Sequence, residues 1–206
     1  MRETAAKPRR LSDIVRSLDT QADLTIGRLV DEFGERAFGA LMFIFAVPNM
    51  IPTPPGTSAV LGLPLVILTF QLMIGRQVLW LPEVIRRRTI SRSMMEGFVR
   101  RAVPAMVRFE RILRPRLSLL VLSNPAERLI GIVSFALAII LFLPIPLVNI
   151  LPAAAITCLA LGLAERDGIA ALIGYVLATG TTLLLGVIST ALYAAARAFV
   201  QTLIGF

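Results

Sequence analysis

Three long uncharged stretches dominate the pattern of apolar and polar positions along this chain. Residues 37–75, 129–164 and 168–196 contain no Asp, Glu, Lys or Arg. A transmembrane α-helix needs about 20 consecutive apolar residues, and each stretch exceeds that length. We therefore predict an all-α, polytopic membrane protein, with a cytoplasmic amphipathic segment at 1–36 followed by a single membrane domain at 37–206.

Prolines interrupt the first of these stretches. Residues 48–64 contain a Pro54-Pro55-Gly56 turn and three further prolines, each of which removes a backbone donor. In hydrocarbon, a broken helix must be shielded by protein, line a wet cavity or lie near an interface. Two interpretations stay open: an ordinary helical hairpin with its turn at the far interface, or a re-entrant hairpin whose helix ends meet below the surface. A weaker interruption at 144–152 predicts a second hairpin of this kind.

The polar segments predict helices at the membrane surface. Apolar residues recur at helical spacing from Leu11 and again from Asp23, which indicates either two surface helices or an ordinary soluble extension. Residues 76–128 form a basic interfacial segment with 12 arginines and four glutamates. Within it, the apolar positions of 90–113 predict an amphipathic helix on anionic membrane lipids. Trp80-Leu81-Pro82 predicts an interfacial anchor, because Trp favours the headgroup level.

The basic residues also set the expected orientation in the membrane. Residues 1–36 carry seven Lys or Arg and residues 76–128 carry twelve, so both segments are expected to be cytoplasmic. The first two apolar stretches then each enter and leave on the same side, and Arg166 is cytoplasmic too. The third stretch is long enough for one full span, tilted or slightly bent at its glycines.

Composition narrows the functional classes. The chain is 56% hydrophobic, whereas a soluble domain is roughly 45–50% apolar. It has no histidine, which excludes His-based catalysis and His metal sites, and its single cysteine excludes an intramolecular disulfide. We expect no metal, no cofactor and no enzymatic activity, with lipid chemistry through Glu165 or Asp167 as the enzymatic alternative. The net charge of +8 comes from arginines that flank apolar stretches, so we expect no nucleic-acid binding.

Short motifs recur in the two interrupted stretches. Glu35-Arg36-x-x-Gly39 reappears as Glu127-Arg128-x-x-Gly131, and Asn49-Met-Ile-Pro52 reappears as Asn149-Ile-Leu-Pro152. The shifts are 92 and 100 residues, so the pattern indicates either an internal repeat or a chance recurrence of common membrane residues. The charge pattern favours a same-direction repeat over an inverted one. Transporters often bind substrate where two repeated, discontinuous helices meet.

The candidate substrate-binding residues follow from these interruptions. Helices that begin at Thr57 or Ser58, at Pro64 or at Pro152 would present free N–H groups, which favour anions. The arginines at the ends of the apolar stretches, Arg76, Arg128 and Arg166, could attract phosphate. Their alternative role is to set the topology and to contact lipid headgroups. Gln71 needs partners in a span, and a helix–helix hydrogen bond is its alternative role. The candidates are Asn49, Thr53, Thr57, Ser58, Gln71, Arg76, Asn149 and Arg166.

Several of these motifs resemble the ExoD family of bacterial membrane proteins. The resemblance covers about 11–200 and is carried by Thr53-Pro-Pro-Gly-Thr-Ser-Ala59, Leu61-Gly-Leu-Pro64, Trp80-Leu-Pro82 and Arg166-Asp-Gly168. It implies a protein of the bacterial inner membrane with a role in exopolysaccharide synthesis. The family name records a phenotype, so the resemblance implies no active site.

Two functions remain open. The first is transport or flipping of an anionic substrate, such as a polyprenyl-phosphate carrier, bound between the two hairpins. The second is a non-transporting adaptor that organises a polysaccharide-synthesis complex through its Arg-rich cytoplasmic surface. Because three apolar stretches hardly enclose a protected path, we also predict a homodimer, packed through small-residue faces such as Ala170, Gly174 and Ala178 or Gly168, Ala171 and Tyr175.

Overall fold

The computed structural model describes residues 25–50, 57–89, 121, 123–142 and 149–204. This part of the chain is helical apart from its connecting segments and an isolated bridge between Thr25 and Thr89, so the prediction of an all-α fold is confirmed. The turn at 54–56, the helix expected from Leu11 and the amphipathic helix expected in 90–113 lie outside the described residues. The elements are α2 (Ile26–Phe33), η1 (Gly34–Arg36), α3 (Ala37–Ala46), η2 (Val47–Met50), α4 (Thr57–Met73), α5 (Glu83–Arg86), α8 (Asn124–Phe142), α9 (Ile150–Glu165) and α10 (Gly168–Ile204).

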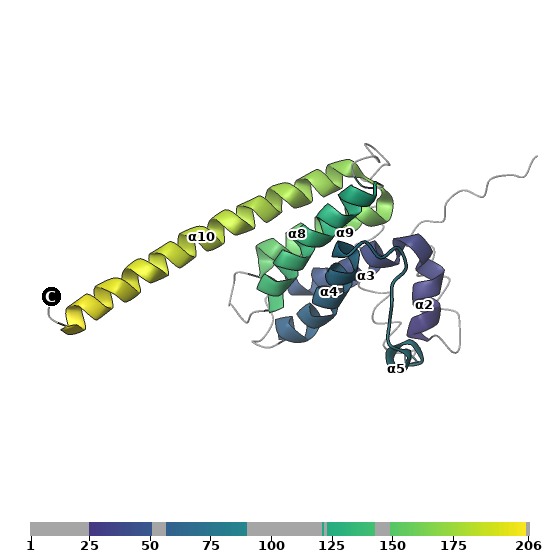
Figure 1. Cartoon of the computed structure of the whole chain (residues 1–206), viewed down its shortest axis with the longest axis horizontal. Coiled ribbons are helices and arrows are strands. Elements are labelled where there is room, and N and C mark those ends of the chain that lie inside the picture. Colours follow the sequence, from purple (N-terminus) through teal and green to yellow (C-terminus); the bar gives the residue numbers. More distant parts are fainter. Residues whose placement is uncertain (1–24, 51–56, 90–120, 122, 143–148, 205–206) are drawn as a thin grey trace, which may run out of the picture.

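Four helices form the centre of the bundle, and α10 packs along its outside (Figure 1). Helix α3 contacts α4 and α9, while α8 contacts the same two helices. The pairs α4–α8 and α3–α9 are antiparallel: the start of α4 lies at the end of α8, and the start of α3 lies at the end of α9. The core between them is apolar, and its largest fully buried side chains include Phe43, Met42, Leu65, Leu72, Ile130, Leu141 and Ile156.

Glycines allow these helices to approach closely. A Cβ on Gly39 would lie 2.7 Å from the Ala160 carbonyl oxygen, and a Cβ on Gly131 would lie 2.7 Å from the Leu72 carbonyl carbon. Association of apolar helices in a membrane depends on close backbone contact, which small residues permit. The Glu-Arg-x-x-Gly motif therefore marks the glycine at which each hairpin's first helix packs on the other hairpin's second helix.

Two helices, α8 and α10, are long and apolar enough to cross a membrane. The other apolar helices are shorter: α4 has 17 residues and α9 has 16. At 1.5 Å per residue they extend about 24–26 Å, which is less than the roughly 30 Å of a bilayer core. The prediction of apolar helices is thus confirmed. Two of them, α4 and α9, are shorter than a full membrane span.

Helices α4 and α9 each contain a proline, at different positions along the helix. Helix α4 begins at Thr57, one of the predicted starts, and continues through Pro64, so the prediction of a helix start at Pro64 is wrong. Helix α9 begins at Ile150 and carries Pro152 in its first turn, where the backbone N–H has no partner within the helix in any case.

Helix α10 is longer than predicted. It runs without interruption from Gly168 to Ile204, 37 residues, and its C-terminal half extends away from the bundle (Figure 1). Its first turns pack on α9, where a Cβ on Gly174 would lie 2.9 Å from the Leu159 backbone N. Ala170, Ala171 and Ala178 are buried as well. The small-residue face that we assigned to a second copy therefore packs against α9 of the same chain.

Candidate anion-binding site

Tight helix ends place two arginines at one end of the bundle. Helix α4 is followed by Gly75 at φ 79°; Gly75 N–H donates to the Leu72 carbonyl (2.9 Å) and Arg76 N–H to the Gln71 carbonyl (3.1 Å). This is the Schellman arrangement, which satisfies the last carbonyls of a helix. Helix α9 ends in the same way, with Arg166 in the left-handed conformation at φ 57°.

The ends of four helices surround a pocket of about 380 Å³. Arg36 and Phe38 come from the start of α3, Leu72 and Arg76 from the end of α4, and Leu163 and Arg166 from the end of α9; the other lining residues are Gln77, Val78, Asn124 and Glu127. We call this the basic pocket. Three arginines against one glutamate give its lining a formal charge of +2.

Arginine at such a position favours a specific class of ligand. The guanidinium group stays protonated and presents a planar fork of donors that matches carboxylate and phosphate oxygens. A concave site with one sign of charge also concentrates ligands of the opposite sign. Gln77 and Asn124 add amide groups that donate and accept hydrogen bonds. The lining of the basic pocket is therefore suited to a phosphate-sized anion.

The segment 77–82, which we call the strap, contributes Gln77 and Val78 to the lining of this pocket. Gln71, 5% exposed near the end of α4, fixes the strap in place. Its Nε2 donates to the Trp80 carbonyl (3.1 Å), and its Oε1 accepts from the Trp80 N–H (2.8 Å). The reciprocal pair holds the Trp80 backbone while the residue stays 57% exposed. Gln71 therefore has an intramolecular partner for both ends of its amide.

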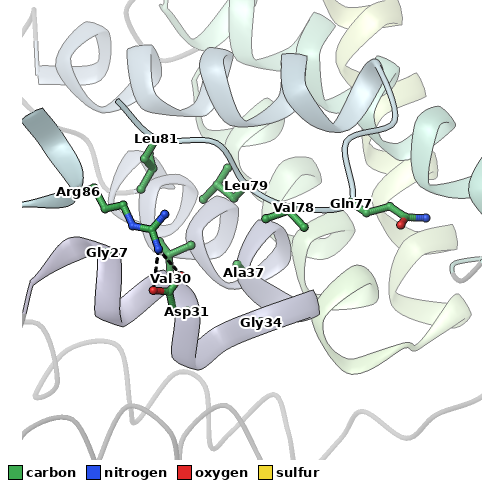
Figure 2. A pocket seen from close by; sticks show the side chains of 10 residues that line it. All are labelled: Gly27, Val30, Asp31, Gly34, Ala37, Gln77, Val78, Leu79, Leu81 and Arg86. Atoms are coloured by element: carbon green, nitrogen blue, oxygen red, sulfur yellow. Dashed lines mark hydrogen bonds and ion pairs between the residues drawn. The ribbon is translucent and has the colours of Figure 1, made fainter. Parts of the chain in front are cut away.

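A second, more apolar pocket of about 370 Å³ lies between the strap and α2. Its walls include Val30 and Ala37 on one side and Leu79 and Leu81 on the other, and Figure 2 shows these side chains between the two segments. At one end, Arg86 donates to both carboxylate oxygens of Asp31, at 3.0 and 2.8 Å. We call this the apolar pocket.

Comparison with known proteins places this architecture in a family. The family model for exopolysaccharide synthesis, ExoD, matches residues 9–187. The chain belongs to the ExoD family. It is 32% identical over 178 residues to Protein ExoD of Rhizobium meliloti, which covers 84% of this chain and 74% of that protein. The suspected resemblance is thus confirmed, and the family's link is to exopolysaccharide synthesis.

Another relative of this ExoD-family chain is an uncharacterized protein of Synechocystis, 38% identical over 136 residues. The match covers 66% of the chain but only 64% of the Synechocystis protein, just under two thirds of its length. No solved structure matches the chain. The family together with the two apolar helices indicates a membrane protein.

The predicted site residues fall at two ends of the ExoD bundle. Arg76 and Arg166 line the basic pocket together, and Gln71 lies one turn from Arg76. Asn49 lies in η2, beyond the end of α3, and Asn149 lies directly before α9. Both are at the end of the bundle away from the basic pocket, so the structure does not bring them to the arginines. Thr57 and Ser58 begin α4 at that far end too, and Thr53 lies outside the described residues.

The two asparagines share one feature. Asn49 is 3% exposed and its Nδ2 donates to the Phe45 carbonyl at 2.8 Å. Among the described residues, the Oδ1 atoms of Asn49 and Asn149 are both buried without a hydrogen-bond partner. The two asparagines that recur in the sequence therefore each place a buried side-chain oxygen without a partner at the same end of the bundle.

The candidate list did not include the other four polar or charged residues of the basic pocket: Arg36, Gln77, Asn124 and Glu127. Arg36 and Glu127 belong to the two Glu-Arg motifs that open the apolar stretches, which was the available signal. Arg128, which we grouped with the other block-end arginines, instead places its guanidinium against Gly75. Asn124 and Gln77 carry no sequence signal that would have distinguished them.

The conformation of Arg166 predicts a difference between two substitutions. Arg166→Gly and Arg166→Ala remove the same guanidinium group, but only glycine adopts a φ of 57° without strain. We expect Arg166→Gly to be more stable than Arg166→Ala by about 1 kcal/mol. Equilibrium unfolding in SDS, followed by circular dichroism, measures the difference. Equal stabilities would mean that the end of α9 relaxes to another conformation.

Proposed function

We propose that this ExoD-family protein binds the anionic group of a substrate in the basic pocket and transports or flips that substrate across the bacterial inner membrane. The observation that carries the proposal is the convergence of Arg36, Arg76 and Arg166 from three helix ends on one pocket. The link to exopolysaccharide synthesis is consistent with an anionic carrier as the substrate.

The orientation that we propose places the basic pocket on the cytoplasmic side, with residues 1–36 and 76–128. Support comes from the pocket itself, because residues from both ends of the first two apolar stretches line it: Arg36, Arg76, Glu127 and Arg166. Each stretch therefore leaves the bundle at the end where it entered. Positive charge at that end is expected to remain cytoplasmic.

We also propose that the two hairpins form a same-direction internal repeat, re-entrant from the cytoplasmic side. A shift of 92 residues relates Gly39 to Gly131 and also relates their contacts, because Ala164 packs on Gly39 where Leu72 packs on Gly131. Under that shift α3 corresponds to α8 and α4 corresponds to α9. The antiparallel contact between α3 and α9 therefore has its counterpart in the contact between α8 and α4. The short lengths of α4 and α9 support the proposal that these two helices end within the bilayer.

Substitution of Arg76 tests the proposed site. We expect Arg76→Gln to weaken binding of pyrophosphate at least about tenfold, because it removes a charge-assisted contact. Isothermal titration in nanodiscs of zwitterionic lipid gives the affinity. Arg87→Gln is the matched control, since Arg87 directly follows α5, lines neither pocket and has its side chain 83% exposed. Equal losses in both variants would indicate a general charge effect and contradict the site.

Transport itself needs a separate measurement. Proteoliposomes should move anionic lipids or pyrophosphate between compartments, and Arg76→Gln should slow this movement without changing insertion. The competing proposal is an adaptor whose surface includes the exposed Arg87 and Arg88. If Arg76→Gln supports exopolysaccharide synthesis in cells while Arg87→Gln with Arg88→Gln abolishes it, the adaptor is correct. The homodimer also remains a proposal, and native mass spectrometry decides it.

A further inference from the structure

The basic pocket and the apolar pocket adjoin each other and share two lining residues. Gln77 and Val78 of the strap line both of them. The opposite wall is divided in the same way at the start of α3, where Ala37 faces the apolar pocket while its neighbours Arg36 and Phe38 face the basic pocket. The two pockets therefore lie side by side and meet at 36–38 and 77–78.

Their linings are chemically different along one direction. Figure 2 shows Gln77 at one end of the apolar pocket and the Arg86–Asp31 ion pair at the other. Between these ends the lining is aliphatic, with Val30, Leu79 and Leu81. Beyond Gln77 the lining becomes cationic, with Arg36, Arg76 and Arg166. A ligand that occupies both compartments needs an anionic group at one end and an apolar chain at the other.

We propose that the ligand of this site is a single-chain anionic amphiphile, such as the phosphate monoester of a long alcohol. Its phosphate lies among the three arginines and the first part of its chain lies along Val30, Ala37 and Leu81. This rests on the proposed function, because it assumes the basic pocket as the anion site. A small soluble anion would leave the apolar compartment unused, and a neutral lipid would place no negative charge in the arginine-rich compartment.

The natural reporter is Trp80, the single tryptophan of the chain, which lies on the strap that borders both pockets. In nanodiscs of zwitterionic lipid, its fluorescence is titrated with inorganic phosphate, butyl phosphate, dodecyl phosphate and dodecanol. We expect affinity to increase from inorganic to butyl to dodecyl phosphate, by about fourfold for each methylene that enters the apolar pocket. Dodecanol should bind more weakly than dodecyl phosphate, and Arg76→Gln should remove that difference.

Two variants separate pocket binding from partition into the nanodisc lipid. Leu81→Asn should flatten the dependence on chain length and leave the affinity for inorganic phosphate unchanged, because Leu81 lines the apolar pocket alone. Val78→Asn, at a position 80% exposed, should also flatten the dependence on chain length with little risk to folding. Because Val78 lines both pockets, the comparison with inorganic phosphate depends on Leu81→Asn alone. The proposal is overturned if wild-type affinity does not depend on chain length, or if both variants keep that dependence. In either case inorganic phosphate still binds and the proposed function stands; if no phosphate compound binds, the proposed function fails as well.

Discussion

Gly131→Ala is expected to lower the free energy of unfolding by about 2 kcal/mol. The added Cβ would lie 2.7 Å from the Leu72 carbonyl carbon and from Met73 Cα, so it meets backbone that a side-chain rotation does not move. Helices α8 and α4 would have to separate along their contact. Gly39→Ala should have a similar effect, since its Cβ would lie 2.7 Å from Ala160 O and Ala164 N.

The matched control for this prediction is Gly186→Ala. A Cβ at Gly186 has nothing within 4 Å, so the substitution gains helix propensity without steric cost. We expect it to be neutral or to stabilise α10 by up to about 1 kcal/mol. SDS unfolding should therefore show lower stability for Gly131→Ala and unchanged or higher stability for Gly186→Ala. A neutral Gly131→Ala would contradict the close α4–α8 contact and remove one support of the repeat.

The helices were predictable because each apolar stretch satisfies its own backbone hydrogen bonds, whatever it packs against. Helix α4 begins at Thr57, directly after Pro54-Pro55-Gly56 in the sequence, which are the residue types with the lowest helix propensity. Pro64 misled the prediction because packing against α8 and α3 retains a helix that has lost one internal hydrogen bond. Local chemistry thus accounts for the start of α4, and tertiary contacts account for its continuation through Pro64.

The site was only half predictable. Arg76 and Arg166 carry a chemical signal, positive charge next to apolar helix, and they do line one pocket. Asn49 and Asn149 carry a different signal, polarity within an apolar stretch, which places them at the far end of the same helices. Polar residues within the same apolar stretches therefore need not belong to the same binding site. Which helix ends meet depends on packing between the hairpins.

Small residues illustrate the same limit. The face formed by Ala170, Gly174 and Ala178 permits close helix contact, but its sequence does not say whether the partner helix belongs to the same chain. The structure assigns it to α9. Any dimer must therefore use another surface, and the C-terminal half of α10, with Leu183, Val187 and Phe199 exposed, is apolar enough to face either lipid or protein.

Gln71→Met is expected to release the strap. Methionine keeps the length of the side chain but removes both hydrogen bonds to Trp80, leaving a backbone N–H and a C=O to find other partners. Each group left without one costs about 1–3 kcal/mol, so we expect a loss of about 2–4 kcal/mol in stability. Because Gln77 and Val78 line both pockets, anion affinity should fall with it.

The matched control is Gln77→Met on the same strap, whose side chain is exposed. It removes an amide of the pocket lining without freeing the Trp80 backbone, so the free energy of unfolding should stay within about 0.5 kcal/mol of wild type. Acrylamide quenching of Trp80 then distinguishes the two variants, since only Gln71→Met should change the environment of the indole. Wild-type quenching and stability in Gln71→Met would mean that the strap is fixed by Leu79, buried against the bundle, rather than by the amide. In that case the roles that sequence reasoning gave to Gln71, substrate ligand or helix–helix partner, would again be open.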